Sequence, residues 1–225
     1  MSENKMSSAR LFQKTSFAGV QIGLALVLWG WVLFPSTNPL SIVAASLILC
    51  IYGLVSYFGL PKIQPEILYW AGIFGVIAGT IFAGEIILEY ILLPKDNTSW
   101  GLIEFGSVFF IYFLSSVWVS YRRDRVRPGM LSAVLTAMIS ALIWLIVVLI
   151  VFYVFRGTDR QTEVLRAEAT YDDFARSGMA DFNTFLMEDF LGAGFFHLLL
   201  GPILATILGV FGGFLGKGMA RIKKR

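Results

Sequence analysis

Residues 68–94 read LYWAGIFGVIAGTIFAGEIILEYILLP, an apolar stretch that nevertheless carries two carboxylates, Glu85 and Glu89. A membrane-spanning helix needs about 20 mostly apolar residues, and this stretch is longer than that. Acidic side chains inside such a helix nearly always face protein or water, because hydrocarbon cannot solvate their charge. The stretch therefore predicts a transmembrane helix that turns one face toward the interior of a helix bundle.

That face combines the two carboxylates with small residues. At about 100° per residue, Gly75, Gly79 and Ala83 fall on one stripe, and Glu85 and Glu89 lie beside it, one turn apart. Small residues allow membrane helices to approach each other closely. We therefore expect this helix to lie at the centre of the bundle, with its bulky side chains toward lipid.

The composition places the whole chain in a membrane. Of 225 residues 57% are hydrophobic and 15% charged, which is more apolar surface than a soluble core of this size can bury. The net charge of +3 is explained by Lys and Arg at one membrane face, so nucleic acid is not expected as a partner. One cysteine, Cys50, excludes an intrachain disulfide, and one histidine, His197, excludes a multi-His zinc site. We expect no metal and no cofactor.

Six apolar runs predict an all-α, polytopic bundle of six transmembrane helices. Sequences rich in proline, glycine and polar residues, such as PSTNP at 35–39, mark the breaks between them. A head at 1–16 precedes the predicted transmembrane domain at 17–216, and a basic tail at 217–225 follows it. The expected spans are 17–34, 41–60, 67–93, 102–121, 130–155 and 191–216.

Lys and Arg are distributed unequally between the two sides of this predicted bundle. Thirteen of the eighteen basic residues fall in the head, the second and fourth connections and the tail, which share one side. Because basic short loops stay in the cytoplasm, we expect a plasma-membrane protein with both termini cytoplasmic. A topology anchor explains the two basic clusters better than a specific lipid site, although both would contact anionic headgroups. These residues are Arg122, Arg123, Arg125, Arg127, Lys223, Lys224 and Arg225.

Residues 156–190 are too polar to span a membrane. Thr158 followed by Gln161 fits a helix-capping box, so one helix is expected over 159–176, ended by Gly178. The residues up to 190 are expected to form a helix along the outer interface. We interpret 156–190 as a short extracytoplasmic helical cap between the fifth and sixth spans; the alternative is a lid that captures a ligand.

Four ionisable residues share the outer half of the predicted bundle and form a candidate polar intramembrane site. They are Glu85, Glu89, Glu104 and His197. Intramembrane carboxylates often bind protons, cations or ammonium groups, and histidine titrates near neutral pH. The alternative is structural, with each group hydrogen-bonded to a neighbouring helix or reaching the headgroups. We expect the four to converge.

The small residues of the third and sixth spans predict close helix packing. In these two spans they are Gly75, Gly79, Ala83, Gly201, Ala205, Gly209, Gly212 and Gly216.

No nucleophile motif, Walker sequence or metal-protease motif occurs, so we expect no enzyme. Two functions remain open. The first is a non-enzymatic accessory protein that packs against a membrane partner or a second copy of itself. The second is a small transporter or substrate-binding transport subunit with an outer-facing site around Glu85, Glu89 and His197.

Overall fold

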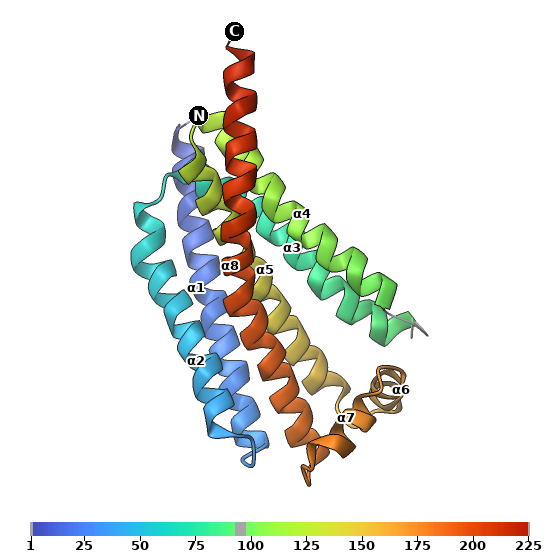
Figure 1. Cartoon of the computed structure of the whole chain (residues 1–225). Helices are drawn as coiled ribbons and strands as arrows, with labels where there is room; N and C mark the ends of the chain where they lie inside the picture. The colour runs from blue at the N-terminus through green and yellow to red at the C-terminus, as the bar shows by residue number, and fades with distance from the viewer. Residues whose placement is uncertain (1, 93–97, 225) are drawn as a thin grey trace.

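The computed structural model describes residues 2–92 and 98–224, and it is all-α (Figure 1). Six of its helices are long and apolar enough to cross a membrane. The prediction of a multi-pass helical membrane protein is therefore confirmed. The elements are α1 (Ser2–Leu33), α2 (Pro39–Leu54), which continues through a π-helical turn (Val55–Gly59) and a 3-10 turn (Leu60–Lys62), α3 (Pro65–Leu92), α4 (Thr98–Arg123), α5 (Val126–Phe155), α6 (Asp159–Ala167), α7 (Thr170–Ser177) and α8 (Phe182–Lys223).

Helix α5, rather than α3, lies at the centre of the bundle. It packs against α1, α3, α4 and α8. Its most apolar window is 61% buried, compared with 33% for the corresponding window of α3. The expectation of a central third span is thus wrong. Helix α5 contains both small and branched residues on several faces, which lets it contact neighbours all round.

The small residues of α3 and α8 do pack closely, and they do so within this chain. A Cβ added at Gly75 would lie 2.8 Å from Ile139 Cβ of α5, and one at Gly209 would lie 3.0 Å from Met130 Cα of the same helix. Ala83 and Ala205 are also buried. Gly201 differs, because a Cβ there would meet no atom within 4 Å. Close packing is therefore a property of most, but not all, of these positions.

A row of buried hydroxyl groups joins α4 to α5 and α8. Ser115 Oγ lies 2.7 Å from Ser132 Oγ and 3.0 Å from Thr136 Oγ1. Ser116 donates to the backbone oxygen of Gly209 at 2.6 Å. Hydrogen bonds between membrane helices replace contacts with water that the bilayer cannot supply. This polar row fixes one half of α4 against the bundle.

The segment between α5 and α8 differs from its prediction in two ways. Two short helices, α6 and α7, replace the single helix expected at 159–176, because Ala169 has a left-handed backbone (φ 57°) that interrupts helical hydrogen bonding. The predicted cap at Thr158 is present, since its hydroxyl accepts from the Gln161 N–H at 3.2 Å, and Gly178 ends α7 with φ 69°.

Helix α8 also begins at Phe182 instead of 191, so the end of the predicted cap belongs to the last long helix. Asp181 caps this helix by accepting from the Thr184 N–H at 2.6 Å. Hydrogen bonds from the side chain and backbone of Thr184 lower the pKa of Asp181. The sequence predicted a separate interfacial helix up to residue 190, whereas in the structure this helix continues directly into the last span.

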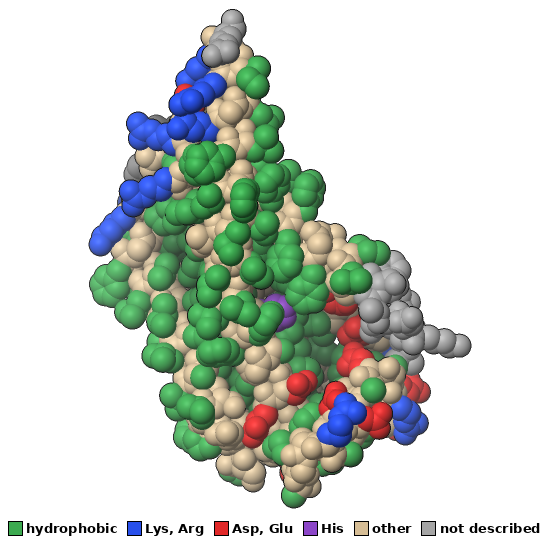
Figure 2. Space-filling model, viewed as in Figure 1, with side chains coloured by type: hydrophobic (Ala, Val, Ile, Leu, Met, Phe, Trp, Pro, Cys, Tyr) green, Lys and Arg blue, Asp and Glu red, His purple; other side chains and the backbone are tan. Residues whose placement is uncertain are grey.

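The basic end of the bundle is held by ion pairs. Arg122 and Arg123 contact Glu66 at 2.7 and 2.9 Å, and Lys224 contacts Asp124 at 2.7 Å. Lys223 lies over the Tyr121 ring, whereas Arg125 and Arg127 are exposed, and Arg225 falls outside the described residues. In Figure 2, Lys and Arg gather near this end, while Asp and Glu gather toward α6 and α7. The Glu66 side chain is only 16% exposed in its pairs, whereas the Lys224–Asp124 pair lies at the surface, where ion pairs contribute little stability.

Candidate functional site

A cavity of about 260 Å³ is lined by residues of α3, α4, α5 and α8, with α6 beside it. Figure 2 shows the molecule hollowed here, with the only histidine of the sequence above several acidic side chains. The hollow is large enough for a small molecule or several waters. Its ionisable lining is Glu85, Glu89, Tyr90, Glu104, Glu168, Asp189 and His197, and the described lining contains no Lys or Arg.

Helical spacing brings these side chains to the cavity. Glu85 and Glu89 are four residues apart on α3, and Asp189 and His197 are two turns apart on α8. Residues separated by three or four positions share a helix face. The structure thus places all four residues of the candidate site on one cavity, although their function stays a prediction.

The carboxyl groups contact one another in two pairs across helices. Glu104 of α4 lies beside Glu85 of α3, and Glu89 of α3 lies beside Glu168, directly after α6. Two neighbouring carboxyl groups repel each other when both are ionised, and a shared proton or a bound cation relieves that repulsion. This arrangement can therefore store protons, or exchange them for a cationic ligand.

Glu104 is the most deeply placed of these acids. Its residue surface is only 7% exposed, and its Oε1 is buried without a hydrogen-bond partner among the described residues. A buried polar atom that accepts no hydrogen bond costs roughly 1–3 kcal/mol, and more when the group is charged. A donor brought within reach of this oxygen would remove that cost.

His197 lies among aromatic rings. The centroid of its ring is 4.3 Å from that of Trp144, 5.0 Å from Phe82 and 5.8 Å from Phe105, with which it stacks. Aromatic neighbours fix the orientation of the imidazole and give the cavity one apolar wall.

No family model, no curated protein and no solved structure matches the chain. The described residues contain no group of three His, Cys, Asp or Glu arranged to hold a metal ion.

Two acids of the cavity were missed as site residues in the sequence. Asp189 lies two turns before His197, and that spacing could have assigned it to the same face. Glu168 falls within the helix expected at 159–176, which was interpreted as part of the cap. Glu168 lies close to Glu89 because α6 folds back onto α3. The local sequence does not specify that contact.

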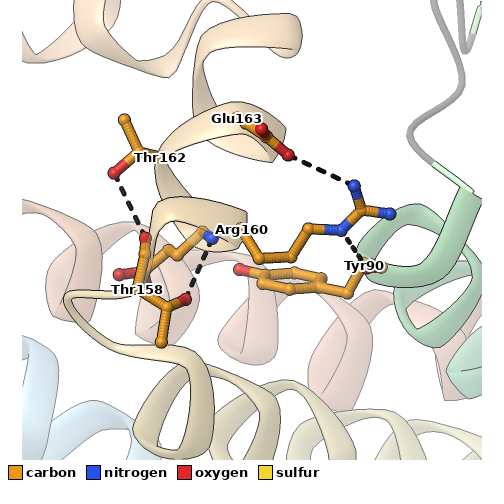
Figure 3. Close-up of polar contacts among 6 residues, drawn as sticks. Tyr90, Thr158, Arg160, Thr162 and Glu163 are labelled. Atoms are coloured by element: carbon orange, nitrogen blue, oxygen red, sulfur yellow. Dashed lines mark hydrogen bonds and ion pairs between the residues drawn. The ribbon is translucent and has the colours of Figure 1, made fainter.

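Hydrogen bonds hold α6 against the end of α3 (Figure 3). Arg160 donates from Nε to the backbone oxygen of Tyr90 and pairs with Glu163 at 3.3 Å. The side-chain oxygen of Gln161 accepts from the Gly157 N–H at 2.9 Å, so the start of α6 is fixed from both sides. These contacts place Glu168 at the rim of the cavity.

Glu168 is expected to make stability depend on pH. Burial at the rim raises its pKa above the ordinary 4.5, and the charges of Asp189 and Glu85 raise it further, while the hydrogen bond with Glu89 opposes the shift. A raised folded-state pKa means that its stabilising contribution is complete below about pH 4.5 and is lost as pH rises through the folded-state pKa. Because part of the residue is exposed, the effect should be modest.

Glu168→Gln tests this expectation, because it keeps the shape and removes the ionisation. Thermal unfolding in detergent should show equal stability of variant and wild type at pH 4, and a more stable variant at pH 8. Asp172→Asn, on the exposed side of α7, is the control and should follow the wild type. A Glu168→Gln variant that is less stable than wild type at pH 8 would contradict the assignment.

Proposed function

We propose that this chain is a non-enzymatic transport protein of the plasma membrane, either a small transporter or the substrate-binding subunit of one. It binds a positively charged solute in the acidic cavity. The observation that carries this proposal is the cavity itself, with five carboxyl groups from α3, α4, α8 and the end of α6 and no Lys or Arg in its described lining. Converging carboxylates in a poorly solvated space favour cations and protons.

The packing of the small residues argues against the accessory-protein alternative. That alternative was motivated by glycine-rich faces available to a partner helix. Gly75, Gly79, Gly209, Gly212 and Gly216 instead contact α4 or α5 of the same chain. The feature that suggested a partner is thus used in folding, whereas the acidic cavity has no comparable structural explanation.

The proposed orientation puts the cavity on the outer side and both termini in the cytoplasm. Its support is the charge distribution, with Lys and Arg concentrated at the end opposite α6 and α7 (Figure 2). A site near the outer leaflet suits a protein that collects a solute from outside the cell.

Ligand-dependent stabilisation of the purified chain tests the proposal. Small ammonium ions such as ethylammonium should raise the unfolding temperature, since a ligand at a hundredfold excess over its Kd stabilises by about 2.7 kcal/mol. Acetate at equal ionic strength should not. Glu104→Gln should abolish the response, and Asp172→Asn should keep it.

Two results would contradict the proposal. One is equal stabilisation of wild type and Glu104→Gln by ethylammonium, which would show that binding occurs elsewhere. The other is the absence of any cation response. A stable hetero-complex in native mass measurements from lipid would then support the accessory-protein alternative.

A further inference from the structure

The lining of the cavity is divided into a charged part and an aromatic part. The carboxyl groups come from α3, α4, the end of α6 and the start of α8, and the rings of Phe82, Phe105, Trp144 and Phe190 complete the wall together with His197. A hydrated inorganic cation would leave the aromatic part unused. The lining is therefore complementary to a ligand that has a positive head and an apolar body.

Glu104 gives independent support for a ligand with N–H donors. It is more than nine-tenths buried, lines the cavity, and its Oε1 accepts no hydrogen bond from the described residues. The Glu85 carboxyl group lies beside it. An ammonium group donates several hydrogen bonds and carries the charge that two neighbouring carboxyl groups attract.

The cavity lies between helices that separate toward one side of the bundle. Helices α4 and α8 touch closely in one half, where Ser116 Oγ bonds to Gly209 O at 2.6 Å. In the other half, stacking of Phe105 on His197 joins them, while Cβ atoms added at Gly106 and Gly192 would meet nothing within 4 Å. Figure 1 shows α3 and α4 diverging from α8 toward α6.

The parts of α4 and α8 beside this separation are apolar and exposed. Leu102 and Ile103 are 73% and 60% exposed, and Phe196 is 51% exposed. Exposed apolar side chains on spanning helices face lipid, so these parts of α4 and α8 border the hydrocarbon region. A solute that passes this way must itself be soluble in the bilayer.

We infer that the cavity takes an amphiphilic organic ammonium, which enters sideways from the membrane between α4 and α8. Its ammonium group bonds to Glu104 and Glu85, its first carbons contact the aromatic wall, and its hydrocarbon tail remains between α4 and α8. This inference rests on the proposed cation-binding function and adds the class of ligand and its route. The same chemistry is offered by a free long-chain amine and by the amine headgroup of a lipid.

The test uses the full chain in phosphatidylglycerol nanodiscs, which contain no amine. Three probes distinguish the contribution of the ammonium group from that of the hydrocarbon tail. They are dodecylammonium, ethylammonium and dodecanol. Dodecylammonium should stabilise the chain at a concentration at least tenfold lower than ethylammonium, and dodecanol should have no specific effect. Glu104→Gln should weaken the dodecylammonium response at least tenfold, and Asp172→Asn should leave it unchanged.

A dodecylammonium with a photoreactive diazirine in the middle of its tail locates the ligand. Peptides from α4 around 102–106 and from α8 around 192–199 should carry the label, and Glu104→Gln should lose it. Adding phosphatidylethanolamine distinguishes the sources: competition identifies an aminolipid as the ligand, and the absence of competition identifies a free amphiphile.

The failures of the two proposals are distinguishable. Equal potency of ethylammonium and dodecylammonium, or label on α1 and α2, would overturn the amphiphile inference and leave the cation site intact. An equal response to dodecanol would also overturn it, because the tail alone would explain the effect. Failure of both ammonium probes would overturn the cation site and the inference together.

Discussion

Gly212→Ala is expected to destabilise the protein, although alanine is the better helix former. A Cβ at this position would lie 2.7 Å from the backbone oxygen of Phe113 and 3.1 Å from Ser116 Cβ, both on α4. A backbone atom cannot rotate away as a side chain can, so α4 and α8 must separate. That separation would also stretch the hydrogen bond from Ser116 to Gly209. Overpacking of this kind costs about 1–3 kcal/mol, occasionally more.

Gly218→Ala is the matched control on the same helix. A Cβ there meets no atom within 4 Å, so the change should be neutral or stabilising through helix propensity, which favours alanine by up to about 1 kcal/mol. Because both variants share that propensity gain, the difference between their unfolding temperatures measures the contact with α4 alone. For a chain of this size, each 1 kcal/mol corresponds to about 2–4 °C. Equal unfolding temperatures for the two variants would show that α4 and α8 are not in close contact.

The membrane spans could be predicted because the residues that define each span are consecutive in the sequence. A run of about 20 apolar residues has few structural solutions in a bilayer, and turn residues such as Gly178 fix helix ends through their own backbone conformation. The i, i+4 spacing of Glu85 and Glu89 likewise predicted their common face. Each of these features depends on residues close together in the sequence.

The remaining features depend on which helices become neighbours. The central position of α5 and the hydroxyl row of Ser115, Ser132 and Thr136 require knowledge of three-dimensional pairing. Helix α6 brings Glu168 to Glu89 because Arg160 bonds to the end of α3 and Val164 packs with Tyr90 and Val151. No alternation or periodicity in the sequence contains that information.

Pro202 removes a backbone hydrogen bond from α8, and a residue distant in the sequence supplies a replacement donor. Within a helix, the carbonyl of Leu198 would accept from the N–H of residue 202, but proline has no N–H. The hydroxyl of Tyr52, on α2, donates instead to Leu198 O at 2.7 Å. Tyr52 is 6% exposed. In the membrane, where water cannot replace a missing donor, this contact satisfies a backbone group that the sequence of α8 leaves unpaired.

Tyr52→Phe should therefore destabilise the chain by about 1–3 kcal/mol, the cost of leaving a buried acceptor without a partner. Restoring the missing N–H with Pro202→Ala should remove most of that cost, so the effect of Tyr52→Phe should be much smaller in the Pro202→Ala background. Thermal unfolding of the four proteins of this double-mutant cycle measures the coupling. Tyr57→Phe, at a position 58% exposed, controls for loss of a hydroxyl and should have little effect. Additive effects of the two substitutions would show that the Tyr52 hydroxyl does not compensate for Pro202.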